Sequence, residues 1–113
     1  MSDFLRQLRD VNRSRLAAWE GGAPADICFH ATELGGEVGE VLNEAKKLHR
    51  EVMGWRGSRS SVDRLAEEIG DVLICLDKLA AQFDIDLAEC TATKFNATSD
   101  KVGLPHKLNW KAA

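Results

Sequence analysis

Two long stretches of this sequence repeat apolar residues at intervals that alternate between four and three. In the first stretch, over about Ala25–Val52, these positions are Leu34, Val38, Val41, Ala45, Leu48 and Val52. In the second, which begins near Ser61, they are Leu65, Ile69, Val72, Leu76, Leu79 and Phe83. Such spacing places apolar side chains along one side of an α-helix, where a second helix can pack lengthwise. The sequence therefore predicts two long helices that share an apolar seam.

Shorter helical segments flank the two long ones. Apolar residues at helical spacing predict a helix over about Asp3–Trp19, which ends at the breaker sequence Glu20-Gly21-Gly22-Ala23-Pro24. Asp86, with Glu89 three residues later, is typical of a helix start, and this last helix is expected to run to about Ser99. We expect an all-α fold, a four-helix-type bundle.

The remaining segments lack helical spacing. Residues 54–60 are glycine-rich and basic, and the tail from Lys101 onward reads as irregular. At 113 residues the chain has the length of one domain. We expect a single domain over 1–113, with a helical core over about 3–100 and an irregular tail over 101–113.

Composition and charge exclude several classes of protein. The chain is 44% hydrophobic and 29% charged, which excludes disordered and low-complexity sequences. Its net charge of −3 argues against a nucleic-acid partner. No apolar run approaches the roughly 20 residues that cross a bilayer, and an acid, Asp3, stands where a signal peptide is basic. We expect a soluble, cytoplasmic protein without a membrane partner, and the odd set Cys28, Cys75 and Cys90 as buried free thiols.

Acidic residues recur beside both seams. The first long helix carries Glu33, Glu37, Glu40 and Glu44, spaced by four, three and four with no basic residue between them. Like charges at these spacings destabilise a helix by a few tenths of a kcal/mol each. The second long helix carries Glu67, Glu68 and Asp71. These acids are therefore candidates for a functional role, with a pair of solvent-exposed acidic edges as the alternative.

Four of the acids have equivalent positions relative to the seams. Each immediately precedes a seam residue; they are Glu37, Glu40, Glu68 and Asp71. If the two helices pack antiparallel, these carboxylates can converge, and four such groups stay ionised only with a counter-charge. Mg²⁺, which binds through a few carboxylates and substrate phosphates, is the natural partner. A di-iron site is disfavoured because no glutamate precedes a histidine by three residues. The scattered histidines, His30, His49 and His106, are expected to be surface or packing residues.

The two acidic segments carry a family resemblance. Gly36-Glu37-Val38-Gly39-Glu40-Val41 resembles the first motif of the MazG-like, all-α nucleoside triphosphate pyrophosphohydrolases, a glutamate pair at i and i+3. Glu67-Glu68-Ile69-Gly70-Asp71 resembles the second motif, Glu-x-x-Asp, about thirty residues later. The resemblance covers roughly residues 25–100. At positions 36 and 47 this sequence has glycine and lysine, which differ from residues that are common in the family. These differences concern the pocket for the nucleobase and hence the choice of substrate.

The resemblance implies a function and a set of site residues. It implies Mg²⁺-dependent hydrolysis (with Mn²⁺ as a possible substitute) of nucleoside triphosphates between the α- and β-phosphates, in homodimers or homotetramers that clean the nucleotide pool. The implied metal ligands are Glu37, Glu40, Glu68 and Asp71, with Glu37 or Glu40 as general base. The implied substrate contacts are Lys94, Asn96 and Trp19. Two alternatives stay open: hydrolysis of another nucleotide, phosphoribosyl-ATP-like or a diphosphate, and a non-catalytic metal-binding module that associates with a partner.

Overall fold

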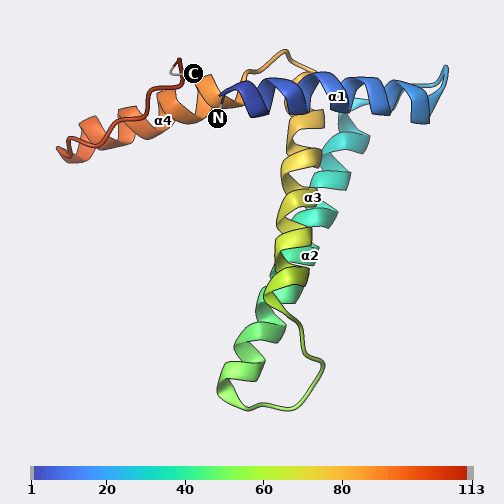
Figure 1. Cartoon of the computed structure of the whole chain (residues 1–113), viewed down its shortest axis with the longest axis vertical. Coiled ribbons are helices and arrows are strands. Elements are labelled where there is room, and N and C mark those ends of the chain that lie inside the picture. The colour runs from blue at the N-terminus through green and yellow to red at the C-terminus, as the bar shows by residue number, and fades with distance from the viewer. Residues whose placement is uncertain (1, 112–113) are drawn as a thin grey trace.

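A computed structural model describes residues 2–111, which form four α-helices joined by loops (Figure 1). The helices are α1 (Ser2–Glu20), α2 (Ile27–Met53), α3 (Val62–Ala81) and α4 (Leu87–Val102). No strand occurs within residues 2–111, so the predicted all-α class is confirmed. The last helix runs to Val102, beyond the expected end at Ser99.

The helix boundaries follow from local capping. Asp26, Ser61 and Asp86 stand at the N-caps of α2, α3 and α4, and each side chain accepts a hydrogen bond from the backbone N–H three residues later. Gly54 and Gly103 end α2 and α4 with φ of 68° and 74°, the left-handed conformation that glycine adopts at low cost. The starts and stops are thus set by short-range interactions that the sequence specifies.

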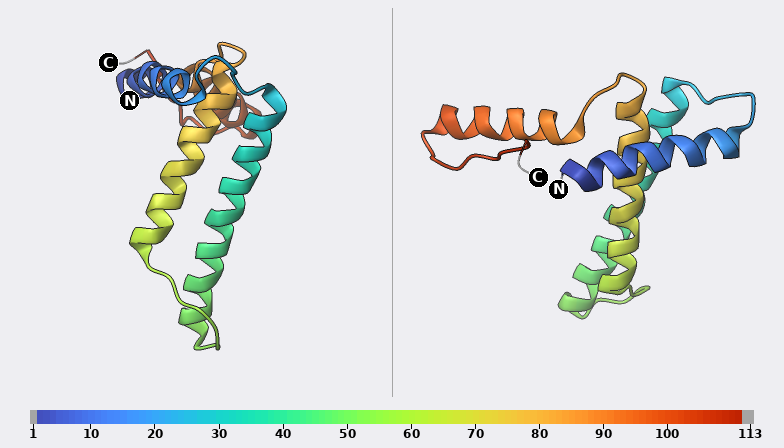
Figure 2. Two further views of the ribbon diagram at one scale, coloured as in Figure 1. Left: turned by 90° about the vertical axis from the view of Figure 1, so that its right-hand side faces the viewer. Right: turned by 45° about the horizontal axis from the view of Figure 1, so that its top comes forward.

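The long helices α2 and α3 form an antiparallel hairpin, and α1 crosses it at the end where α3 finishes (Figure 2). The crossing is fixed by polar contacts as well as by packing. Asp77 on α3 is 1% exposed and accepts hydrogen bonds from Arg9 Nε at 2.8 Å and from Asn12 Nδ2 at 3.1 Å. Arg9 of α1 is therefore turned into the junction with α3 rather than toward solvent.

The helix α4 forms an arm with the irregular tail. The amide of Asn96 donates from Nδ2 to the Leu108 carbonyl at 2.9 Å and accepts from the Leu108 N–H at 2.7 Å. Lys107 and Asp100 form an ion pair beside it. These contacts fold residues 104–111 back along α4.

The chain by itself is open. Figure 1 shows α1 and α4 as a bar across one end of the hairpin, with α4 pointing away from α2 and α3. The radius of gyration is 17.3 Å, against about 13 Å for a compact domain of this length. Within residues 3–111 the buried apolar side chains are Cys75, Ala80 and Ala92. The four helices do not lie side by side in one chain, so the four-helix-type bundle expected of the single chain is not confirmed.

The cysteines are free, but only one is buried. Cys75 lies in the interior as expected, whereas Cys28 and Cys90 are exposed. Cys28 lies in the first turn of α2 and Cys90 in the first turn of α4. Among the residues described, no helix is long and apolar enough to cross a membrane.

Candidate metal centre

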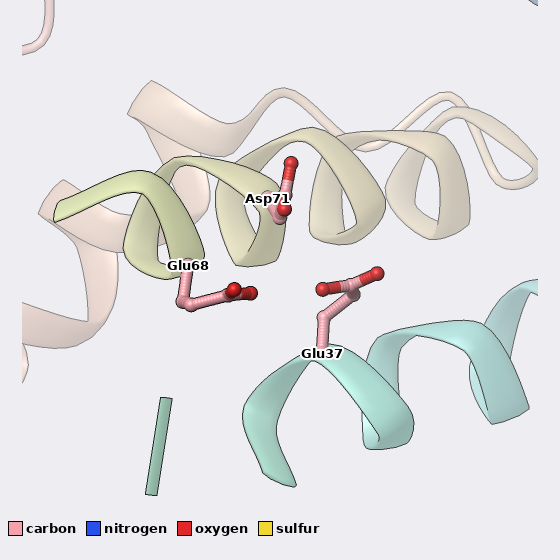
Figure 3. A group of neighbouring side chains, drawn as sticks. All are labelled: Glu37, Glu68 and Asp71. Atoms are coloured by element: carbon pink, nitrogen blue, oxygen red, sulfur yellow. The ribbon is translucent and has the colours of Figure 1, made fainter. Parts of the chain in front are cut away.

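Three carboxylates converge between the two long helices (Figure 3). Glu37 projects from α2, and Glu68 and Asp71 project from α3, where a separation of three residues puts them on one side of the helix. One carboxylate oxygen from each of the three lies within 4.8 Å of the others. The antiparallel hairpin thus brings together acids that are about thirty residues apart in the sequence.

The donor set fits a hard divalent cation. All three side chains offer carboxylate oxygen, the ligand type that Mg²⁺ and Ca²⁺ prefer. Two oxygens on opposite sides of one Mg²⁺ stand about 4.2 Å apart, since each bond is about 2.1 Å. The three carboxylate oxygens, which lie within 4.8 Å of one another, are confined to a region of about that width. Glu37, Glu68 and Asp71 are therefore able to hold one such ion.

Acidic residues on either side of this group form ion pairs with lysines, whereas the acids in the middle of the hairpin do not within the part of the chain that the structure describes. Toward one end, Glu33 pairs with Lys78 across the helices at 2.5 Å. Toward the other end, Glu44 pairs with Lys47 at 3.2 Å and accepts a hydrogen bond from Ser60 Oγ. Between them, and within the described residues, no ion pair involves the acids of the central group, which are Glu37, Glu40, Glu68 and Asp71. Glu33 and Glu44 are therefore each compensated by a lysine, whereas the four acids between them carry no such partner among the described residues.

The pKa shifts follow this distribution of charge. Partial burial, and then the charges of Asp71, Glu40 and Glu37, raise the pKa of Glu68 above its usual value. The hydrogen bond from Ser60, followed by that from Lys47, lowers the pKa of Glu44. Within the central group, Glu68 is thus the carboxylate whose ionisation its neighbours oppose.

At the end of the hairpin near α1, the buried and half-buried polar groups neutralise one another. Burial raises the pKa of Glu33, but the hydrogen bond and charge of Lys78 outweigh that effect and lower it. The thiol of Cys75 donates to Glu33 across 3.5 Å. Burial, together with the negative charge of Glu33, raises the pKa of Cys75 to about 11. These groups form a neutralised structural cluster rather than a second site of free charge.

Glu40 lies beside the group rather than within it. Its carboxylate is exposed and is not among the three whose oxygens come within 4.8 Å of one another. Its charge nevertheless acts on Glu68, one of the causes of the raised pKa of that residue. The structure thus brings three of the four expected ligands together and leaves Glu40 as an adjacent free carboxylate.

The expected substrate contacts do not reach the acidic group within one chain. Trp19 is 80% exposed near the end of α1. Lys94 is exposed on α4 and lines a groove beside the α3–α4 turn. Asn96 uses both ends of its amide to hold Leu108 of the tail. All three belong to the bar formed by α1 and α4, away from the middle of the hairpin (Figure 1).

The sequence reading did not identify the residues that neutralise the flanking acids. Lys47 follows Glu44 by three residues, a spacing at which helical ion pairs form, so this pairing was available from the sequence. Lys78 and Ser60 are brought to their acids only by the register of the hairpin and the path of its loop. No local signal identifies those two contacts.

Comparisons with known proteins do not assign this chain to a family. Neither the protein-family models, the curated proteins nor the solved structures that were searched gave a match. The similarity to MazG-like pyrophosphohydrolases therefore rests on the two acidic motifs and their spacing.

Proposed function

We propose that this chain is a Mg²⁺-dependent hydrolase that cleaves (deoxy)nucleoside triphosphates between the α- and β-phosphates. The products are a nucleoside monophosphate and pyrophosphate, and the role is cleaning of the nucleotide pool in the cytoplasm. One observation carries the proposal: within the described residues Glu37, Glu68 and Asp71 converge without a basic partner, whereas Glu33 and Glu44 farther along the hairpin are each paired with a lysine. A cation with unfilled coordination positions is what such a group attracts, and phosphates fill those positions.

The residues divide into two roles. Glu37, Glu68 and Asp71 are the proposed ligands of Mg²⁺, which when bound supplies positive charge against the phosphate oxygens. Glu40 is the better placed general base because its carboxylate lies beside the group without being one of the three. It accepts the proton of the attacking water while the triad positions the phosphate chain.

We further propose that the protein works as a homo-oligomer. The exposed face of α3 carries an apolar residue every seven positions, namely Val62, Ile69 and Leu76, and Phe83 continues this spacing in the turn after the helix. On α2, Val38 and Leu42 are also exposed. Heptad spacing of this kind is the pattern by which helices pack on one another in bundles.

The surface area supports the same conclusion. The chain exposes 8097 Å², roughly 1,900 Å² more than the about 6,200 Å² of a compact monomer of this mass. An excess of that size in each of two chains matches the interfaces of obligate dimers, about 2,000–5,000 Å² in total. In a dimer the hairpins complete a four-helix bundle, and the exposed side chains of Trp19 and Lys94 of one chain are available to the acidic group of the other, whereas Asn96 is occupied by Leu108 of its own tail.

Cation binding tests the proposal at its first step. Titration with Mn²⁺, followed by electron paramagnetic resonance, should show saturable binding that Mg²⁺ displaces. Glu37→Gln should weaken binding at least tenfold, since it removes one of three charged ligands. Glu51→Gln is the matched control, because Glu51 is an exposed glutamate on the same helix and forms no ion pair with any described residue. Equal binding by the two variants, or none by the unmodified protein, would overturn the assignment of the site.

A further inference from the structure

Hydrogen bonds hold the loop between the long helices against α2. Residues 54–60 run back beside the last two turns of α2, where Arg50 Nη1 donates to the Ser58 carbonyl at 2.8 Å and to its hydroxyl at 3.2 Å. Gly57 makes this approach possible: its φ is 126°, and a Cβ there would lie 2.7 Å from Arg50 Nη1. A basic glycine-rich segment that could have been a flexible loop is thus held in one path.

A second hydrogen bond joins the loop to the acidic residues of α2. Ser60 donates its hydroxyl hydrogen bond to Glu44, which is 7% exposed and is also paired with Lys47. Glu44 follows Glu37 by seven residues on α2, a rise of about 10 Å. Its charge is one of those that act on Glu68. The end of the loop is therefore attached within electrostatic reach of the acidic group.

The hydrogen bond from Ser60 to Glu44 also fixes the backbone position of the neighbouring Arg59. Arg59 directly precedes Ser60, is exposed, and forms no ion pair within the described residues. Its guanidinium matches the geometry of phosphate oxygens and binds them through paired hydrogen bonds. Holding the backbone of Arg59 in advance reduces the ordering cost of such a contact.

We infer that Arg59 binds the terminal phosphates of the substrate, and that the hydrogen bond from Ser60 to Glu44 positions it. This inference rests on the proposed function, since it assumes that the phosphate chain lies on the cation held by Glu37, Glu68 and Asp71. The phosphate chain of the substrate then extends from the cation toward the end of the hairpin where residues 54–60 lie. The contact selects nucleotides with a polyphosphate chain over monophosphates, and it lets the monophosphate product leave.

Binding of a phosphate chain without a base tests the role of Arg59. The probe is inorganic tripolyphosphate with Mg²⁺, measured by calorimetry on the full chain. Arg59→Gln should weaken its binding tenfold or more, the usual effect of losing a charge-assisted hydrogen bond. Arg15→Gln is the matched control, since it removes the same charge from an exposed residue of α1 and should leave the affinity within twofold.

Substitutions of Ser60 test separately whether its hydrogen bond to Glu44 positions Arg59. Ser60→Ala should also weaken tripolyphosphate binding, while Ser60→Thr, which keeps the hydroxyl, should restore it. In the double variant with Arg59→Gln, Ser60→Ala should cause no further loss, because the two residues act through one contact. An additive loss would overturn the positioning role.

The failure of this inference is distinguishable from failure of the proposed function. Mn²⁺ binding reports on the acidic group alone and should be the same in Arg59→Gln as in the unmodified protein. Tripolyphosphate affinity unchanged by Arg59→Gln, in protein that binds Mn²⁺, overturns the inference and leaves the cation site intact. Absence of Mn²⁺ binding in the unmodified protein overturns both.

Discussion

Arg9 donates from Nε to Asp77 Oδ1 across 2.8 Å and from Nη2 to the Ile85 carbonyl across 2.7 Å. The first contact joins α1 to α3, and the second joins α1 to the turn that leads into α4. One side chain therefore holds the crossing of α1 over the hairpin and the direction in which the α4 arm leaves it.

Loss of this arginine should cost substantial stability. Arg9→Met leaves Asp77 buried without its charged partner, and a broken buried pair typically costs about 3–5 kcal/mol. The matched control is Arg6→Met, because Arg6 pairs with Asp3 at the surface, where such pairs contribute about 0–1 kcal/mol. Urea unfolding measures both variants. Equal losses would contradict the structural role given to Asp77.

The acidic group should destabilise the cation-free protein and stabilise the loaded one. Glu68→Gln removes one of several mutually repelling charges, so in EDTA its melting temperature should exceed that of the unmodified protein. With Mg²⁺ the order should reverse, since a ligand at 100 times its Kd adds about 2.7 kcal/mol to the state that binds it. Melting curves with and without Mg²⁺ measure both effects. The same order in both buffers would argue against a cation at this position.

The exposed stripe on α3 should control assembly. Leu76→Glu places a charge within the proposed interface and should convert the oligomer to monomer in sedimentation experiments. The monomer should keep its helical circular dichroism, because Leu76 is exposed in the single chain. Glu67→Lys is the control on the same helix, at an exposed position outside the stripe. A monomeric unmodified protein, or an oligomer that survives Leu76→Glu, would contradict the proposed face.

The cysteines should differ sharply in reactivity. The thiolate is the reactive form, and the pKa of Cys75 is raised to about 11 from 9.0. At pH 8, Cys28 and Cys90 should react with a thiol reagent in folded protein, whereas Cys75 should react only after unfolding. The folded chain keeps the Cys75 proton above pH 9.0 while the unfolded chain loses it, so this thiol also lowers stability as the pH rises from 9.0 toward 11. Rapid labelling of all three thiols at pH 8 would contradict the burial of Cys75.

The sequence predicted the parts of the molecule that depend on local periodicity. Seam spacing and capping residues such as Asp86 gave the four helices to within a few residues. Antiparallel pairing of the long helices also placed Glu37 near Glu68 and Asp71, as expected. Local signals were sufficient here because each acid stands in a fixed relation to a seam residue.

Relations between distant elements were not predictable in the same way. The seam pattern does not show that Ile69 and Leu76 stay exposed, since an apolar stripe looks the same whether its partner is in the same chain or another. No local signal identifies Arg9 as a residue of the helix junction, because its partner Asp77 lies 68 positions away. The position of Glu40 outside the triad depends on the exact rotation of α2, which periodicity does not fix.

Product analysis tests the central claim most directly. The unmodified protein with Mg²⁺ should release pyrophosphate from at least one of a panel of standard and modified dNTPs, and EDTA should stop the release. Glu37→Gln should reduce turnover by about a hundredfold or more, as the loss of a key electrostatic contact does in other enzymes. Orthophosphate as the sole product would contradict cleavage between the α- and β-phosphates. No product from folded, cation-bound protein would contradict catalysis altogether and favour a binding module.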